Sequence, residues 1–206
     1  MEKPKFSPFP WLYSEGKNKF NPFRKGKSFM KELIVSIETK SDVDLKTHGI
    51  CKHAASRKFS LTLFGFSKDS GPAQVLDIED GETLPGEILD ALKDEKVIKW
   101  SFEADFERIC ISRYLGMPAG EYLSPRSWRS IKASCEKLGI SMKLPQKEQI
   151  ISKQLLRRFR TPSAANIHPY YSARARYIEY AKRKVEHAAE LRGKLLQAEG
   201  KEVGSY

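Results

Sequence analysis

The sequence predicts an α/β protein in which helices pack against a mixed sheet. Three segments with the alternation and residue types of strands come in series, at residues 33–38, 59–66 and 73–78. Helical and strand-like segments then alternate along the next part of the chain. Strands in series followed by alternating helices and strands favour a mixed sheet with helices against it.

The individual elements follow from local patterns. In the first strand side chains alternate, so that Ser36 and Glu38 point to the same side. Gly71-Pro72 marks the turn between the second and third strands. The patterns further along predict a helix at 84–92, a short strand at 97–100, a helix at 104–115 that stops at Gly116, and helices at 128–138 and 149–159.

A long helix is predicted from about residue 173 to 196, after a loop bracketed by Pro162 and Pro169. Lysine is rarely buried without a partner, yet Lys184 falls within the apolar stripe of this helix. We therefore expect an acidic group opposite Lys184, or a buried stem whose ammonium reaches water. The stripe recurs at steps of three and four residues and consists of Tyr177, Ala181, Lys184, Ala188, Leu191 and Leu195.

The chain is expected to divide into three parts: an extension at 1–31, a domain at 32–198 and a tail at 199–206. Prolines exclude long regular elements from the extension, which interleaves aromatic residues with cations. Such a segment can stack on bases and neutralise phosphates. It can equally pack its aromatic rings on the domain or on a partner protein.

Composition limits the function further. The 206 residues carry a net charge of +11, which favours a polyanionic partner, most often nucleic acid, over a generically basic protein. Three widely spaced cysteines indicate reduced thiols. There is no apolar run long enough for a membrane span and no signal-peptide core, so we expect a cytoplasmic protein without a membrane partner.

Three ordered motifs resemble those of a nuclease family. Residues 36–45 (SIETKSDVDL) resemble D-I-E-T-x-S-x-x-D-L, the first motif of the proofreading 3′–5′ exonuclease domain in phage-type family A DNA polymerases. Residues 97–110 resemble the second motif, usually N-A-x-F-E/D, and residues 180–184 lie where the third, Y-x-x-x-D, belongs. The resemblance covers roughly residues 32–195. It implies the ribonuclease-H-like fold of the DEDD exonucleases and is compatible with a phage-encoded protein.

In that family four carboxylates hold two magnesium or manganese ions, which clamp the attacking and leaving oxygens of a phosphodiester. The resemblance places Ser36, Glu38, Glu107 and Lys184 at the four ligand positions, and Tyr180 where a tyrosine orients the attacking water. Hard cations require oxygen ligands, and two of the four carboxylates are missing. We therefore expect no metal cofactor, and a Lys184 ammonium paired with Glu38 or Glu107 in its place.

Three functions remain open from the sequence. The first is a catalytically degenerate exonuclease-like protein that binds single-stranded DNA or RNA or serves as a structural subunit of a nucleoprotein assembly. The second is an active 3′–5′ exonuclease with magnesium or manganese at a remodelled site of Glu38, Glu103 and Glu107. The third is a protein-interaction or inhibitor module. For the first, the expected phosphate contacts are Lys17, Lys19, Arg24, Lys25, Lys153, Arg157, Arg158, Arg160, Arg174 and Arg176.

Overall fold

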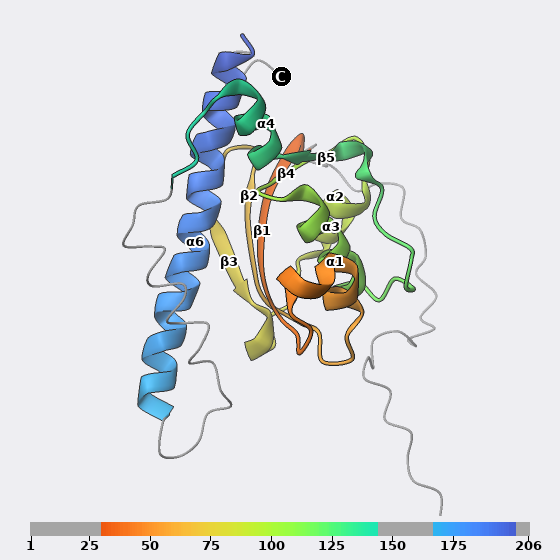
Figure 1. The fold of residues 1–206 in the computed structure, drawn as a ribbon. Coiled ribbons are helices and arrows are strands. Elements are labelled where there is room, and N and C mark those ends of the chain that lie inside the picture. The colour runs from red at the N-terminus through yellow and green to blue at the C-terminus, as the bar shows by residue number, and fades with distance from the viewer. Residues whose placement is uncertain (1–29, 144–166, 201–206) are drawn as a thin grey trace, which may run out of the picture.

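The computed structural model describes residues 30–143 and 167–200, with side chains in the last helix from residue 174 onward. A five-stranded sheet forms its centre, in the order β3-β2-β1-β4-β5 (Figure 1). The central strand β1 pairs antiparallel with β2 and parallel with β4; β2 pairs antiparallel with β3, and β4 pairs parallel with β5. The strands are β1 (Glu32–Lys40), β2 (Ser60–Lys68), β3 (Gln74–Asp77), β4 (Ile98–Ser101) and β5 (Trp128–Ser130). This mixed sheet has the predicted ribonuclease-H-like arrangement.

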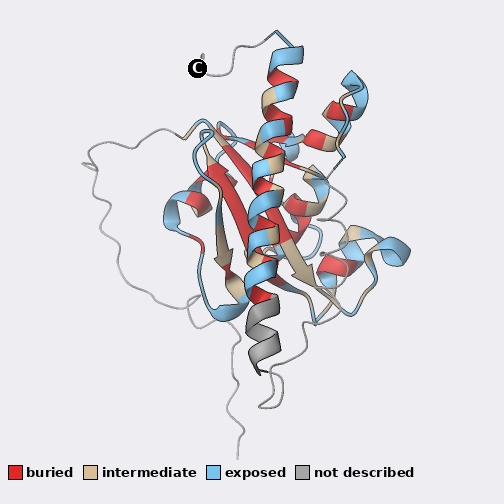
Figure 2. Ribbon diagram, turned by 90° about the vertical axis from the view of Figure 1, so that its left-hand side faces the viewer, coloured by how far each residue is buried: buried red, intermediate tan, exposed pale blue. Residues whose placement is uncertain are grey.

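Helices cover both faces of the sheet. The long helix α6 (Ile167–Ala198) crosses one face, with α4 (Ile131–Leu138) beside its C-terminal half (Figures 1 and 2). The other face is covered by α1 (Leu45–Ala55), α2 (Gly86–Lys93) and α3 (Ala104–Tyr114). Two short 3-10 helices complete the described elements, at Ile78–Asp80 and Pro125–Ser127.

Strand β1 is buried on both sides because it lies in the middle of the sheet. Leu33, Val35 and Ile37 pack into the larger core beneath α1, α2 and α3. Ile34 points the other way and packs with Val185 in the core beneath α6. By alternation, Ser36 and Glu38 share the α6 side of the sheet with Ile34.

Helix α6 approaches the sheet closely at one point. Gly65 on β2 stands opposite Ser36 on β1, and a Cβ on this glycine would lie only 2.7 Å from Cγ2 of Val185. A side chain there would push the helix away. The predicted stripe of α6 faces the sheet, since Tyr177, Ala181, Ala188, Leu191 and Leu195 are all buried.

Two expectations about the elements were wrong. The helix predicted at 128–138 begins at Ile131, because residues 128–130 pair with β4 and the Ser130 hydroxyl accepts the hydrogen bond of the Ala133 N–H as an N-cap. Pro169 does not close a loop but lies within the first turn of α6, where a missing N–H costs no helical hydrogen bond.

Helix α1 was not predicted. Gly49 interrupts its helical geometry with φ +78°, and its apolar residues do not form a regular stripe. The predicted helix at 149–159 and residues 1–29 of the extension lie outside the described residues. No helix within the described ranges is both long and apolar enough to cross a membrane.

Candidate functional site

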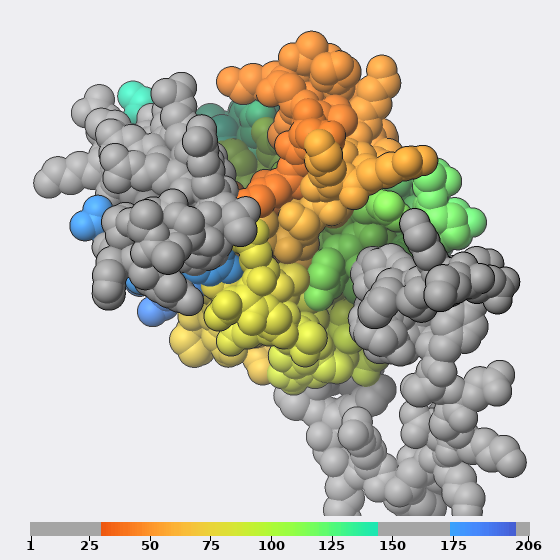
Figure 3. All heavy atoms as spheres, turned by 90° about the horizontal axis from the view of Figure 1, so that it is seen from below, coloured from red at the N-terminus to blue at the C-terminus, as the bar shows by residue number. Residues whose placement is uncertain are grey.

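The candidate site lies where β1 leaves the sheet. Because β1 and β4 are parallel, the segments that follow them emerge at the same edge. Figure 3 shows this end of the molecule, where the segment after β1 (orange) meets those after β3 (yellow) and β4 (green). Glu38 comes from the end of β1 and Glu107 from the first turn of α3, while Lys184 comes from the middle of α6.

Glu38 has both of its carboxylate oxygens occupied by groups of α6. Lys184 donates from Nζ to Oε1 across 2.6 Å, and the hydroxyl of Tyr177 donates to Oε2 across 3.1 Å. The side chain of Glu38 is 13% exposed and that of Lys184 is 26% exposed. The expected acidic partner of Lys184 is therefore confirmed, and its identity is Glu38.

The surroundings of Lys184 keep it charged. Burial alone would lower the pKa of this amine, but the negative charge of Glu38 outweighs burial and raises the pKa above its ordinary value. The ammonium also lies 5.8 Å from the centre of the Tyr180 ring, a distance at which a cation is attracted to the ring face. Lys184 is thus a fixed positive charge at the site.

The two other predicted ligand positions are buried. Ser36 is 7% exposed and offers a neutral hydroxyl. Glu107 is 4% exposed, and its Oε2 atom has no hydrogen-bond partner. Burial raises the pKa of Glu107 to about 8, although the charge of Lys184 acts in the opposite direction. At neutral pH the Glu107 carboxyl is therefore mainly protonated, and the Glu38–Lys184 pair is electrically neutral.

These side chains do not fit a two-metal centre. Magnesium and manganese take oxygen ligands, preferably carboxylates. Here one position is a serine, one is a lysine, one carboxylate is committed to Lys184 and Tyr177, and the pKa of the other carboxyl is raised by burial. Within residues 30–143 and 174–200, no group of three or more His, Cys, Asp or Glu side chains is arranged to hold a metal ion.

The alternative metal set is not assembled either. Glu103 is exposed, and its Oε1 accepts a hydrogen bond from Lys132 at 2.7 Å. The ion pair commits this carboxylate to α4, the helix that contains Lys132, rather than to Glu38. Although Glu103 and Glu107 are four residues apart, Glu107 is buried in the first turn of α3, whereas Glu103 is the exposed N-cap residue of this helix.

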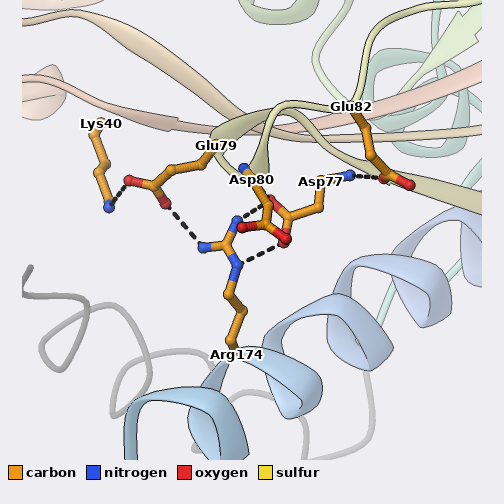
Figure 4. A network of polar contacts seen from close by, with 6 residues as sticks. All are labelled: Lys40, Asp77, Glu79, Asp80, Glu82 and Arg174. Carbon is orange, nitrogen blue, oxygen red and sulfur yellow. Dashed lines mark hydrogen bonds and ion pairs between the residues drawn. The ribbon is translucent and has the colours of Figure 1, made fainter. Parts of the chain in front are cut away.

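One predicted phosphate contact has a different role. Arg174 is buried, and it donates from Nε to Asp77 across 2.5 Å and from a terminal nitrogen to Glu79 across 2.9 Å (Figure 4). Glu79 is also paired with Lys40. We therefore correct the assignment of Arg174: its guanidinium joins α6 to the end of β3 instead of facing a strand of nucleic acid.

Arg176, two residues further, is exposed and remains a candidate phosphate contact. Sequence reasoning missed the roles of Tyr177 and Arg174. Tyr177 was counted as part of the apolar stripe, and the only signal for its role was a hydroxyl one turn before the third motif. The signal for Arg174 was its position ten residues before Lys184, near the same face of α6.

The positive charge is unevenly distributed along the sequence. Residues 1–29 contain seven Lys or Arg and two Asp or Glu, and residues 144–166 contain five and one. These two segments account for +9 of the net +11. They also contain the other predicted phosphate contacts, which lie outside the described residues: Lys17, Lys19, Arg24, Lys25, Lys153, Arg157, Arg158 and Arg160.

The sheet order and the position of the site agree with the fold that the three motifs predict. No family model matches the chain. It is 34% identical over 142 residues to the DNA polymerase of Bacillus phage SP02, in an alignment that covers 65% of this chain and 21% of the polymerase. The chain therefore spans about a fifth of the length of that relative. The predicted resemblance to phage DNA polymerases is confirmed.

Solved structures with a similar fold include a nuclease in its apo form, with 19% identity and a TM-score of 0.49 over 81% of this chain and 72% of that one. They also include Brucella melitensis NrnC, with 19% identity and a TM-score of 0.39 over 84% and 80%. NrnC has been solved with bound Mg²⁺ and bound to pGG as well.

Proposed function

We propose that this protein is a catalytically degenerate 3′–5′ exonuclease-like protein that binds single-stranded nucleic acid without hydrolysing it. The observation that carries the proposal is the ion pair between Lys184 and Glu38. It places an ammonium against a carboxylate at a position where the exonuclease motifs call for a metal ligand.

The loss of hydrolysis follows from electrostatics. Two divalent cations near one another need several negative charges to hold them. At neutral pH the site supplies one charge from Glu38, which Lys184 cancels, and burial raises the pKa of Glu107, which favours its protonated form. A divalent cation at this site would also stand close to the ammonium of Lys184 and be repelled by it.

Nucleic-acid binding is supported by charge. A net charge of +11 attracts a polyanion, and most of the excess lies in the two segments rich in lysine and arginine. The described domain is close to neutral, because only +2 of the net charge remains outside these segments and the C-terminal residues 201–206. We therefore assign most of the salt-dependent affinity to residues 1–29 and 144–166.

Two measurements test the proposal. The first incubates the protein with end-labelled single-stranded DNA and RNA in magnesium or manganese, and we expect the strands to stay intact. The second measures binding by fluorescence anisotropy between about 50 and 200 mM salt, where log K should fall linearly with log salt. Metal-dependent shortening of the strands would instead support the active exonuclease. Binding that is absent, or that does not change with salt, would support a protein-interaction module.

A further inference from the structure

A surface cavity lies on the opposite face of the sheet from α6. It has a volume of about 140 Å³ and lies between the C-terminal half of α1 and the loop that follows α3. Ala54 and Ala55 of α1 form one wall, and Met117, Pro118 and Tyr122 of the loop form the other. An apolar cavity of roughly 150 Å³ holds a single benzene-sized ring. The space therefore suits one planar ring.

Tyr122 is held in place at this cavity. It is one of the large side chains that stay exposed, with 36% of its surface accessible. Arg108 lies over its ring, 5.8 Å from the ring centre. Arg108 is itself fixed, because it donates to the Leu123 carbonyl across 3.0 Å and to Asp105 across 2.9 Å. The aromatic ring is thus presented to solvent with little rotational freedom to lose on binding.

The charges around the cavity favour an anionic ligand. Helix α1 contains Lys46 and Lys52, both exposed, and no Asp or Glu. Arg57 is exposed just after the helix, and Arg113 lines the cavity itself. Glu121 is the carboxylate among the lining residues, and it can accept a hydrogen bond from an amino group.

We propose that this cavity takes one nucleobase of a bound single strand, with the neighbouring phosphates lying along α1. An exposed aromatic ring, an apolar floor, an adjacent guanidinium and one hydrogen-bond acceptor are the groups that recognise an unstacked base. None of the residues that line the cavity belongs to the Glu38–Lys184 site, so the cavity is a separate place in the fold. The inference rests on the proposed function, because it names a contact of the same strand.

The test compares Tyr122→Ala and Tyr122→Phe, with Leu138→Ala as the control for an exposed apolar residue on α4. Binding of a fluorescent single strand is measured against an abasic strand of the same length. Since base–aromatic stacking contributes about 1–3 kcal/mol per base, Tyr122→Ala should weaken binding of the normal strand at least about fivefold. Its affinity for the abasic strand and its salt dependence should stay unchanged, and the Phe and Leu138 variants should bind like the wild type.

The outcomes separate the two proposals. If the wild type binds neither strand, the proposed function fails and the base contact fails with it. If it binds both strands equally well, or Tyr122→Ala binds normally, the base contact alone is overturned. A second experiment uses an acidic peptide that contains an aromatic residue. If this peptide binds the wild type without displacing the strand, and does not bind Tyr122→Ala, the cavity belongs to a protein partner and the base contact is overturned. Near-UV circular dichroism and thermal melting establish that each variant is folded.

Discussion

Lys184 on α6 and Glu38 on β1 meet across 146 positions of sequence, with 2.6 Å between Nζ and Oε1. Neither side chain is fully exposed, and the second oxygen of Glu38 accepts a hydrogen bond from Tyr177. The carboxylate is therefore satisfied entirely by groups of one helix. The same contact attaches α6 to the central strand and removes the negative charge that a metal ion would need.

Lys184→Ala should destabilise the protein. The change leaves Glu38 largely buried with Tyr177 as its remaining partner. Breaking a buried pair by removing one member costs about 3–5 kcal/mol, and the partial exposure of Lys184 places the expected loss near the lower end, at about 3 kcal/mol. Urea denaturation at pH 7 measures it. Lys182→Ala is the matched control, since Lys182 is exposed on the same helix and its removal should change stability by less than about 0.5 kcal/mol.

A double change should create a metal site. Ser36→Asp together with Lys184→Asp would place four acidic groups at the positions of the exonuclease motifs, counting Glu38 and Glu107. Without metal this variant should be less stable than the wild type, because like charges face each other. Magnesium or manganese should raise its melting temperature in proportion to log concentration, whereas the wild type should show no shift. Equal metal-induced shifts in both proteins would contradict the account of the site.

The helix of Lys184 shows how much the sequence could predict. Its apolar stripe required a partner for the lysine, and the first motif supplied Glu38 as a candidate. Strands β1 to β4 and most helix positions also followed from the hydrophobic period and from glycine and proline, whereas β5 lay within a predicted helix. The sequence left Glu38 and Glu107 as alternatives, because choosing between them depends on how α6 is rotated and how far it lies from the sheet. Gly65 permits the close approach of α6 to β2, and no local sequence pattern predicts this approach.

Arg174 shows what could not be predicted. In sequence it is one cation among many on a basic helix, and an exposed phosphate contact was the natural expectation. Its burial depends on Asp77 and Glu79, which lie almost a hundred residues earlier and reach it through the pairing of β3 at the sheet edge. Contacts between distant segments of this kind are set by topology rather than by local periodicity.

Arg174→Ala should cost more stability than any change at an exposed cation of α6. The substitution leaves Asp77 buried without its guanidinium and frees Glu79 from one of two cationic partners. We expect a loss of about 3 kcal/mol or more in urea denaturation. Arg176→Ala, two residues away and exposed, should stay within about 0.5 kcal/mol of the wild type. The double variant Arg174→Ala with Asp77→Asn should recover part of the loss, because the buried carboxylate no longer carries an unpaired charge. If Arg174 acted only by packing, the second change would recover nothing.

Deleting residues 1–30 should weaken binding of single strands and make it less sensitive to salt. The deletion removes seven Lys or Arg and two Asp or Glu, together with all of the aromatic residues of the extension. For single strands the slope of log K against log salt is about −0.7 per phosphate neutralised, so fewer contacts give a shallower slope. Anisotropy titrations at several salt concentrations measure both effects. An unchanged slope would place the phosphate contacts elsewhere in the chain.

Glu107 should make the stability of the protein fall as pH rises. Burial raises its pKa from an ordinary 4.5 to about 8, so between these values the folded state holds one proton that the unfolded state has released. Stability from this group is fully present below about pH 4.5 and is lost as pH rises through 8. Each unit of pKa shift corresponds to about 1.4 kcal/mol, so the loss amounts to several kcal/mol.

Glu107→Gln, which stays neutral in both states, should remove this dependence and be the more stable protein at pH 9. Glu136→Gln, at an exposed position on α4, serves as the control and should leave the pH profile as it is in the wild type. The measurement is the denaturation midpoint of each variant from pH 5 to pH 9. If the stability of the wild type rises with pH and that of Glu107→Gln rises in parallel, Glu107 is ionised in the folded protein.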